Sequence, residues 1–249
     1  MYRILSLGVA ITTLILTGCA DIGSSDIRTS GICADIDVYN SNNRVQIDTT
    51  LTAGCGLGGS YVVLDGSDYL SANYLSANYI LSKHSGFLTN ITSYHATSNT
   101  NYTAGELVNV ELNRDSTSVS AANSFANLLS PFTLTQPANY SVFTSGQNIN
   151  FSWDRSLPGT SVYLQLECNK SDGSHTTTTM SRTTSATSYQ IDVAEVYNVL
   201  YDPGGATPLS CSGTANVKQR LAGTIDPAYE NGSTITSSYL QTRNININF

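Results

Sequence analysis

Short segments in which apolar and polar residues alternate constrain the fold of this chain more than any other feature. The clearest are 148–153 (NINFSW) and 161–168 (SVYLQLEC). A period of two is typical of a β-strand with one buried face, and Gly, Pro, Asn and Ser between segments favour turns. Comparable alternation or short apolar runs occur at 33–39, 45–51, 61–64, 88–94, 107–112, 132–137, 188–192, 211–221 and 234–249. The sequence therefore predicts an all-β chain.

The composition excludes two other classes of protein. Charged residues make up 12% of the 249 residues, and the formal net charge is −7. A nucleic-acid-binding surface needs clustered cations, which an acidic chain with scattered Lys and Arg does not supply. The chain also has 15 Tyr, 6 Phe and 1 Trp, which is too much aromatic content for an intrinsically disordered protein.

The length suits two domains of about 100 residues each. We predict two tandem β-sandwiches at 31–130 and 131–249, because the strand pattern breaks at Ser130-Pro131. Just before this break, 120–129 (SAANSFANLL) predicts two helical turns. The connection is short, so we expect structural damage in one sandwich to stay within it.

The second half carries two further signals. Asp192 and Glu195 form a capping box that predicts a short helix. Ile149, Phe151 and Trp153 share one face of a predicted strand, which places the only tryptophan in the core of the second sandwich.

Five cysteines are present: Cys19, Cys33, Cys55, Cys168 and Cys211. The last four suggest two disulfides, and four cysteines allow three pairings. Their clustering at the two ends of the chain favours Cys33–Cys55 and Cys168–Cys211. No CxxC pair is present and the three histidines are far apart in the sequence, so we expect no zinc or other metal site.

The N-terminal segment has the pattern of a processing signal. Arg3 precedes an apolar stretch of 13 residues, 4–16, which is shorter than the roughly 20 residues of a membrane-spanning helix. Leu16-Thr17-Gly18-Cys19 follows directly. This motif resembles the lipobox of bacterial lipoproteins.

The resemblance implies cleavage of residues 1–18 and attachment of lipid to Cys19. Residues 19–30, which are small and polar, are then expected to form a flexible tether. Ala20 directly after the cysteine implies the outer membrane, by analogy with enterobacterial lipoproteins, although Asp21 at the next position does not favour this assignment. The lipid would be the membrane contact, at the periplasmic face or the cell surface.

The C-terminal half resembles a fibronectin type III or immunoglobulin-like β-sandwich. The features that carry this resemblance are an early proline, Pro137, a tryptophan on the second strand, and a helical crossover late in the domain. Cys168 follows Trp153 in the chain, unlike the order in antibody domains. A Cys168–Cys211 bridge would therefore not be the usual bond between the two sheets.

Two local sequence features, a glycine-rich run and a direct five-residue repeat, have structural explanations. The run 54–59 (GCGLGG) matches the GxGxxG dinucleotide fingerprint, but a strand follows it where nucleotide binding needs a helix. It predicts a tight turn beside a disulfide. The direct repeat of Tyr69–Asn73 as Tyr74–Asn78 predicts a hairpin or loop, because an odd repeat alternates between the faces of a strand.

No catalytic motif is present. His84 and His95 are near enough in sequence to share a surface, and Ser67 with Asp65 or Asp68 could in principle join them. Exposed loop histidines are the simpler interpretation. The 65–68 segment, or Asp35 with Asp37, could ligate calcium, but no EF-hand loop or RTX repeat is present.

These observations predict a non-enzymatic cell-envelope protein with a structural or protein-interaction role and no cofactor. An alternative is a glycan-binding module or adhesin that uses exposed Tyr and Asn side chains. The expected partners are the membrane, through the lipid, and other envelope proteins or glycans; nucleic acid is excluded.

Overall fold

The computed structural model describes residues 21–41, 44–56, 58–85, 91–99, 101–115, 119–201, 203 and 205–249. The predicted leader and Cys19 lie outside these residues. Eighteen strands, one α-helix and two short 3-10 turns form within the described part of the chain, which confirms the all-β prediction.

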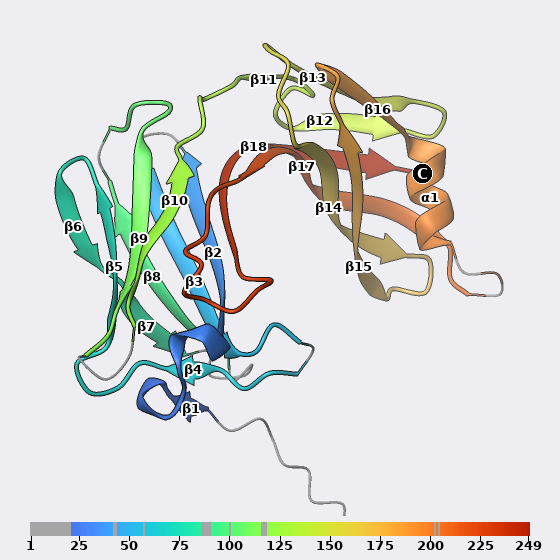
Figure 1. Ribbon diagram of the computed structural model, residues 1–249. Helices are drawn as coiled ribbons and strands as arrows, with labels where there is room; N and C mark the ends of the chain where they lie inside the picture. The colour runs from blue at the N-terminus through green and yellow to red at the C-terminus, as the bar shows by residue number, and fades with distance from the viewer. Residues whose placement is uncertain are drawn as a thin grey trace, which may run out of the picture.

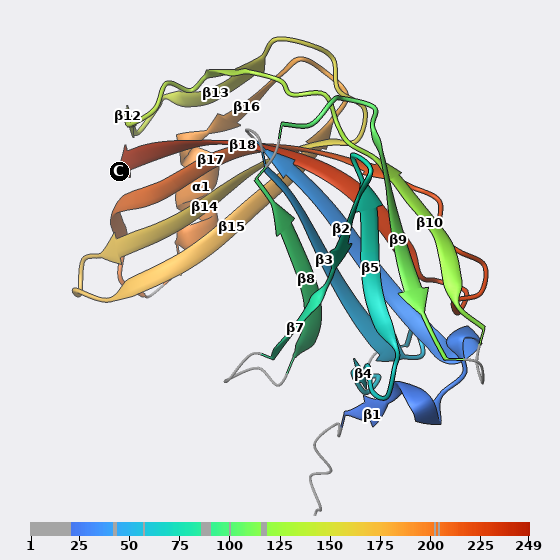
Figure 2. The ribbon, with the colours of Figure 1, turned by 90° about the vertical axis from the view of Figure 1, so that its left-hand side faces the viewer.

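One long sheet runs through the whole molecule (Figures 1 and 2). Its strand order is β15-β14-β17-β18-β2-β3-β8-β7, and β12 pairs in parallel with the far end of β18. The strands of this sheet are β2 (Ile32–Ser41), β3 (Arg44–Ala53), β7 (Ser82–Ser85), β8 (Thr92–Ser98), β12 (Ser141–Thr144), β14 (Thr160–Lys170), β15 (His175–Thr184), β17 (Pro208–Ala222) and β18 (Thr234–Asn248).

A four-stranded sheet covers one half of the long sheet and forms the first sandwich. Its order is β10-β9-β5-β6. Its strands are β5 (Tyr69–Tyr74), β6 (Ala77–Ile80), β9 (Leu107–Asn113) and β10 (Ala121–Asn127). The inward residues of this sheet meet those of β2, β3 and β8 in one hydrophobic cluster. The tandem Tyr69–Asn78 repeat forms the β5–β6 hairpin, as predicted.

A three-stranded sheet and the helix cover the other half and form the second sandwich. The sheet has the order β11-β13-β16. Its elements are β11 (Leu134–Gln136), β13 (Asn148–Trp153), β16 (Ser188–Asp192) and α1 (Val193–Leu200). The first two strands of this sandwich, β11 and β13, share a sheet with a late strand, β16. The third strand and the last two, β14, β17 and β18, lie in the facing sheet. This division of strands is that of an immunoglobulin-like sandwich. The topology thus supports the predicted resemblance.

The two sandwiches are joined through β18 as well as through the 130/131 linker. Thr234–Tyr239 pairs in parallel with Asp35–Asn40 of β2. Ile235 belongs to the first hydrophobic cluster, whereas Ile245 and Ile247 belong to the second. The sequence did not predict this shared strand, because the paired segments lie about two hundred residues apart.

The segment between β17 and β18 also returns to the first sandwich. Tyr229, 4% exposed, packs in the first cluster. The backbone N–H of Glu230 donates to the carbonyl of Ile32 at 2.9 Å, and the N–H of Ala34 donates to Ser233 Oγ at 3.0 Å. Separate folding of 31–130 and 131–249 stays a prediction. In the structure, residues on each side of this boundary help to complete the hydrophobic core on the other side.

The helix predicted for 120–129 is wrong, because β10 occupies this segment. Ser124 is fully buried and its Oγ accepts from the backbone N–H of Asp226. The N–H of Phe125 donates to Thr224 O at 2.7 Å. β9 pairs with this segment on one side and the 224–226 segment bonds to it on the other, which is tertiary information that local propensity does not contain.

The prediction of a flexible tether at 19–30 is wrong from Ile22 onward, because this part of the segment is folded. β1 (Ile22–Gly23) pairs in parallel with β4 (Val62–Val63). Two 3-10 turns follow, Ser24–Asp26 and Thr29–Gly31, with Ser24 and Thr29 buried. Ser24, Ser25 and Thr29 form side-chain hydrogen bonds with residues far away in the sequence, Asp65 and Val119, which composition cannot reveal.

The predicted helix and its cap are confirmed in part. Asp192 accepts a hydrogen bond from the N–H of Ala194 at 2.8 Å, and Val193, Val196 and Leu200 are buried. Glu195 instead pairs with Arg182 on β15. The cap is therefore a single aspartate cap rather than a reciprocal box.

Candidate binding surface

The structure contains two disulfides, each within one sandwich. Cys33 on β2 is bonded to Cys55 in the turn after β3. Cys168 and Cys211 face each other on the neighbouring strands β14 and β17. The second bond therefore lies within one sheet, as predicted. Two such bonds indicate an oxidising compartment, extracellular or periplasmic.

No helix in the described part of the chain is long and apolar enough to cross a membrane. The predicted lipid-attachment residue, Cys19, lies outside the described residues, so its lipidation stays a prediction.

The chain changes sheets near the start of the second sandwich. β11 pairs with β13 in the small sheet, and after Pro137 the chain turns into β12, which pairs with β18 in the long sheet. Pro137 is buried at the change of direction. Neither sheet is fully covered at this corner, so a hollow remains between β12 and β13.

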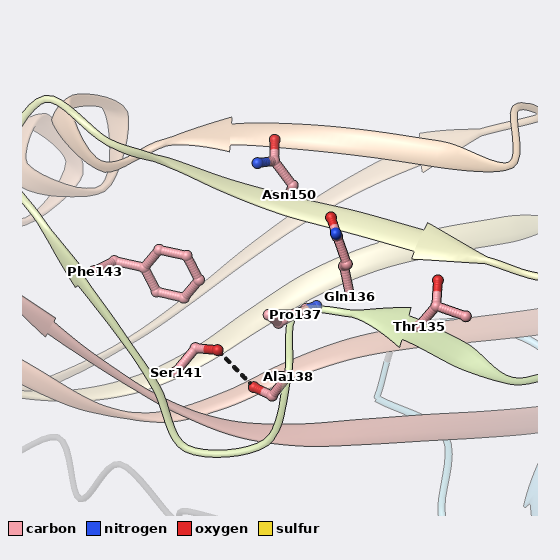
Figure 3. A pocket seen from close by; sticks show the side chains of 7 residues that line it. All are labelled: Thr135, Gln136, Pro137, Ala138, Ser141, Phe143 and Asn150. Atoms are coloured by element: carbon pink, nitrogen blue, oxygen red, sulfur yellow. Dashed lines mark hydrogen bonds between the residues drawn. The ribbon is translucent and has the colours of Figure 1, made fainter.

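Figure 3 shows this hollow, which has a volume of about 310 Å³. Polar and apolar side chains share its wall: Gln136 and Asn150 contribute amides, and the Ser141 hydroxyl donates to Ala138 O at 2.8 Å. The ring of Phe143, half-buried, closes one side. An adjoining hollow of about 420 Å³ shares Ser141, Phe143 and Asn150 and extends to Gln147 and Asn148.

The outer edge of β12 is open beside this hollow. Among the described residues, β18 is the only strand that pairs with β12. Val142 on this strand is 56% exposed, and Tyr140 just before it is 69% exposed. Two N–H groups of this strand already have local partners: Ser141 donates to Ala138 O at 3.2 Å and Thr144 to Gln147 Oε1 at 2.8 Å. An edge strand with exposed apolar side chains can accept a further strand from a partner. We refer to residues 135–150 as the β12 corner.

The tyrosines are mostly not free to stack on a ligand. Of those described, Tyr74, Tyr94, Tyr229 and Tyr239 are buried, and burial raises the pKa of the Tyr229 hydroxyl. Tyr69, Tyr140 and Tyr201 are the strongly exposed ones. Of these three, Tyr140 directly precedes Ser141, which lines the hollow. The half-buried Tyr79 lines a separate hollow together with Asn78 and His95, so glycan binding through tyrosine has a candidate residue at each of these two places.

His84 and His95 do share a surface, on β7 and β8, with ring centroids 5.7 Å apart. The two acids weighed beside them, Asp65 and Asp68, have other partners. Asp65 accepts hydrogen bonds from the Ser24 hydroxyl and from the backbone of Ser25, which lower its pKa. The structure thus does not assemble the histidines with Asp65 into a catalytic group.

The other acids weighed as calcium ligands are likewise engaged. Asp68 forms an ion pair with Arg114 at 3.0 Å, with both side chains almost fully buried. Asp35 accepts from the Thr234 hydroxyl, and Asp37 pairs with Arg220. Within the described ranges, no group of three or more His, Cys, Asp or Glu surrounds a point where a metal ion could sit.

The glycine run at 54–59 is a turn beside the Cys33–Cys55 bond. Gly54 and Gly58 have φ angles of 81° and 86°, which favour glycine. The chain then returns to the sheet by a bridge between Thr52 and Tyr61. No helix begins in the described residues that follow, 58–64, where the dinucleotide fingerprint needs a helix N-terminus for the pyrophosphate.

Sequence reasoning missed the β12 corner altogether. Its signal was weak: only Pro137 followed by Val142 and Phe143 marks a second short strand, and nothing local says that this strand joins a different sheet.

Comparisons with known proteins return structures alone. No family model matches the chain, and no curated protein matches it. The solved structures that resemble it include DIP-gamma IG1+IG2, with 5% identity, 86% of this chain and 94% of that chain covered, and a TM-score of 0.24. Another is chicken CNTN1 FN1-FN3 domains, with 10% identity, 89% and 65% covered, and a TM-score of 0.19. Both TM-scores are low, and neither similarity carries an argument about this chain; its fold class rests on its own strands.

Proposed function

We propose that this protein is a non-catalytic, lipid-anchored component of a bacterial cell envelope that acts by binding other proteins. The observation that carries the binding role is the open edge of β12, with Val142 exposed beside a hollow. Strand addition at such an edge uses backbone hydrogen bonds for affinity and a neighbouring pocket for specificity. The partner is an extended segment of another envelope protein.

Two features support the envelope location. Both disulfides lie within folded sandwiches, as expected of a protein that matures in an oxidising compartment. Leu16-Thr17-Gly18-Cys19 behind an apolar stretch resembles a lipobox. Two or three acyl chains on one cysteine anchor a protein stably, whereas one chain does not.

The anchor is tested by metabolic labelling with an alkyne fatty acid. The wild type should be labelled and Cys19→Ala should not be. Equal labelling of the two proteins would contradict lipidation at Cys19.

The binding role is tested by capture from detergent-solubilised envelopes, with the full-length acylated protein as bait. Val142→Asp places a charge on the open edge and should abolish capture of a partner that the wild type enriches. Leu209→Asp is the matched control, because Leu209 is 52% exposed on β17 of the same sandwich. Equal capture by both variants would refute the β12 edge as the contact.

Glycan binding is the second candidate, and one observation favours it. The hollow combines two amide side chains, a hydroxyl and an aromatic ring without any charged group, which are the groups that hold a neutral sugar through hydrogen bonds and stacking. Asn150→Ala and Tyr140→Ala should each abolish glycan-array binding, while Tyr201→Ala at the end of α1 should not. Absence of glycan binding by the wild type would remove this candidate.

A further inference from the structure

The N-terminal segment is folded almost from the predicted lipid-attachment site. Cys19 lies three residues before Ile22, and three residues of fully extended chain span at most about 11 Å. Ile22 and Gly23 already pair with Val62 and Val63. A lipid on Cys19 would therefore hold this end of the first sandwich next to the bilayer, with almost no free tether.

Hydrogen bonds fix this segment to the sandwich at several points. Asp65 accepts from Ser24 Oγ at 2.8 Å and from the N–H and hydroxyl of Ser25 at 2.9 Å each. The Arg114 guanidinium donates to Ile27 O at 2.9 Å and also to Ser24 O. Because Arg114 is itself held by buried Asp68, the segment 22–31 is a built part of the sandwich.

Two exposed aliphatic side chains flank this segment. Val119 is 72% exposed, and its carbonyl accepts from the Thr29 hydroxyl. Ile91 is 41% exposed, and the adjacent Thr92 hydroxyl donates to Asp21 at 3.3 Å. The exposed charges of 21–31 are Asp21, Asp26 and Arg28, a net charge of one negative unit, so no strong attraction to anionic lipids and only weak repulsion is expected.

We infer that this end of the first sandwich, residues 21–31 with Ile91 and Val119, is a bilayer-contact face. The inference rests on the proposed lipid anchor. The occupant is the lipid surface, because the chain upstream is too short to place the body anywhere else and the rim offers apolar side chains that can enter the headgroup boundary. β1 and β4 lie at the end of the first sandwich remote from the second (Figure 1), so the β12 corner points away from the membrane.

Single-tryptophan quenching by lipids with brominated acyl chains tests this face. The background is Trp153→Phe, and tryptophan replaces Ile91, Val119 or Leu107 in the full-length acylated protein reconstituted in vesicles. Leu107 is the matched control. It is 49% exposed in the same sandwich, but it is the first residue of β9, at the end of that strand near the linker. Emission from positions 91 and 119 should fall by roughly half if these side chains enter the headgroup boundary, and emission from position 107 should not change.

Two controls separate the possible failures. Mass spectrometry of each preparation reports the acyl groups on Cys19. Unquenched emission from positions 91 and 119 with the acyl mass present would overturn the contact face and leave the anchor intact; absence of the acyl mass would overturn both. A spacer of twelve Gly and Ser residues inserted after Ala20 should remove the quenching without removing the lipid.

A second measurement needs no tryptophan substitution. Amide hydrogen exchange of residues 24–29 should be slower in the acylated protein on vesicles than in soluble Cys19→Ala, while exchange in β15 should be the same in both. Equal exchange at 24–29 would contradict the contact face.

Discussion

The two sandwiches differ in how their cores are assembled from the chain. The second draws its core from 129–221 together with the end of β18, and most of its strands follow one another in sequence. The first combines two stretches that lie far apart in the chain: 22–128, which includes the N-terminal segment 22–31, and the return at 223–236. Local alternation predicted strands of both sandwiches, including β2, β3 and β9 of the first. The first sandwich also contains β10 and the segment 22–31, whose structure depends on distant contacts that local patterns do not predict.

Trp153→Ala has the largest expected effect and probes the second sandwich. Trp153 is 4% exposed in its core, so its removal should lower the free energy of unfolding by about 3–5 kcal/mol through lost burial and the remaining cavity. Urea denaturation followed by circular dichroism measures this loss. Native tryptophan emission of the wild type should be blue-shifted. Emission typical of exposed indole, with little loss of stability in Trp153→Ala, would contradict a core position.

The disulfides sharpen the comparison because they differ in exposure. Cys168 and Cys211 are buried between two strands, whereas Cys55 is exposed in a turn. Under native conditions dithiothreitol should therefore reduce Cys33–Cys55 first, as followed by peptide mapping. Loss of each bond should cost roughly 3–4 kcal/mol on the chain-entropy model, with the larger value for the 43-residue separation of Cys168 and Cys211. Earlier reduction of Cys168–Cys211 would reverse the expected order.

Asn40 tests the contact between the first sandwich and the linker. Its side chain is fully buried, donates to Leu129 O at 2.8 Å and accepts from Leu129 N–H at 3.3 Å. Asn40→Ala leaves these two backbone groups without partners and should cost about 1–3 kcal/mol. The exposed Asn78→Ala should change stability by no more than about 0.5 kcal/mol in the same denaturation experiment. Similar losses for both variants would show that the linker contact is unimportant.

The smallest expected effect concerns the N-terminal segment at acid pH. Hydrogen bonds from Ser24 and Ser25 hold the pKa of Asp65 below its ordinary value of 3.8. A carboxylate whose pKa is lower in the folded state than in the unfolded state stabilises the fold. This stabilisation is complete above the unfolded pKa and is lost as the pH falls through the folded pKa. The protection factors of the amides at 22–31, which correct the exchange rates for the intrinsic effect of pH, should therefore fall below about pH 4, and less so in Asp65→Asn. Identical acid profiles would contradict this role of Asp65.

Local periodicity predicted the elements whose partners are close in sequence. The segments 148–153, 161–168 and 188–192 match β13, β14 and β16 closely, and Asp172-Gly173 forms the β14–β15 turn. Clustering of the cysteines gave the pairing that the structure contains.

Elements defined by distant contacts could not be predicted from the sequence. The segment 120–129 became a strand because β9 and the 224–226 return lie beside it. Residues 22–31 are folded because Asp65 and Arg114 bind them. The β12 corner depends on pairing of β12 with the last strand. In each case the partner is supplied by a remote part of the chain, and neither composition nor period contains that information.

The shared sheet has a direct test in hydrogen exchange of the Trp153→Ala variant. Because β18 pairs with β2 and continues into the second core, destabilising that core should also loosen β2. Exchange of the amides of Asp35–Asn40 should accelerate roughly a hundredfold or more, in step with those of β14, as a stability loss of about 3–5 kcal/mol requires for amides that exchange through global opening. Wild-type protection in Asp35–Asn40, with acceleration confined to 131–221, would show that the two sandwiches unfold independently despite their common sheet.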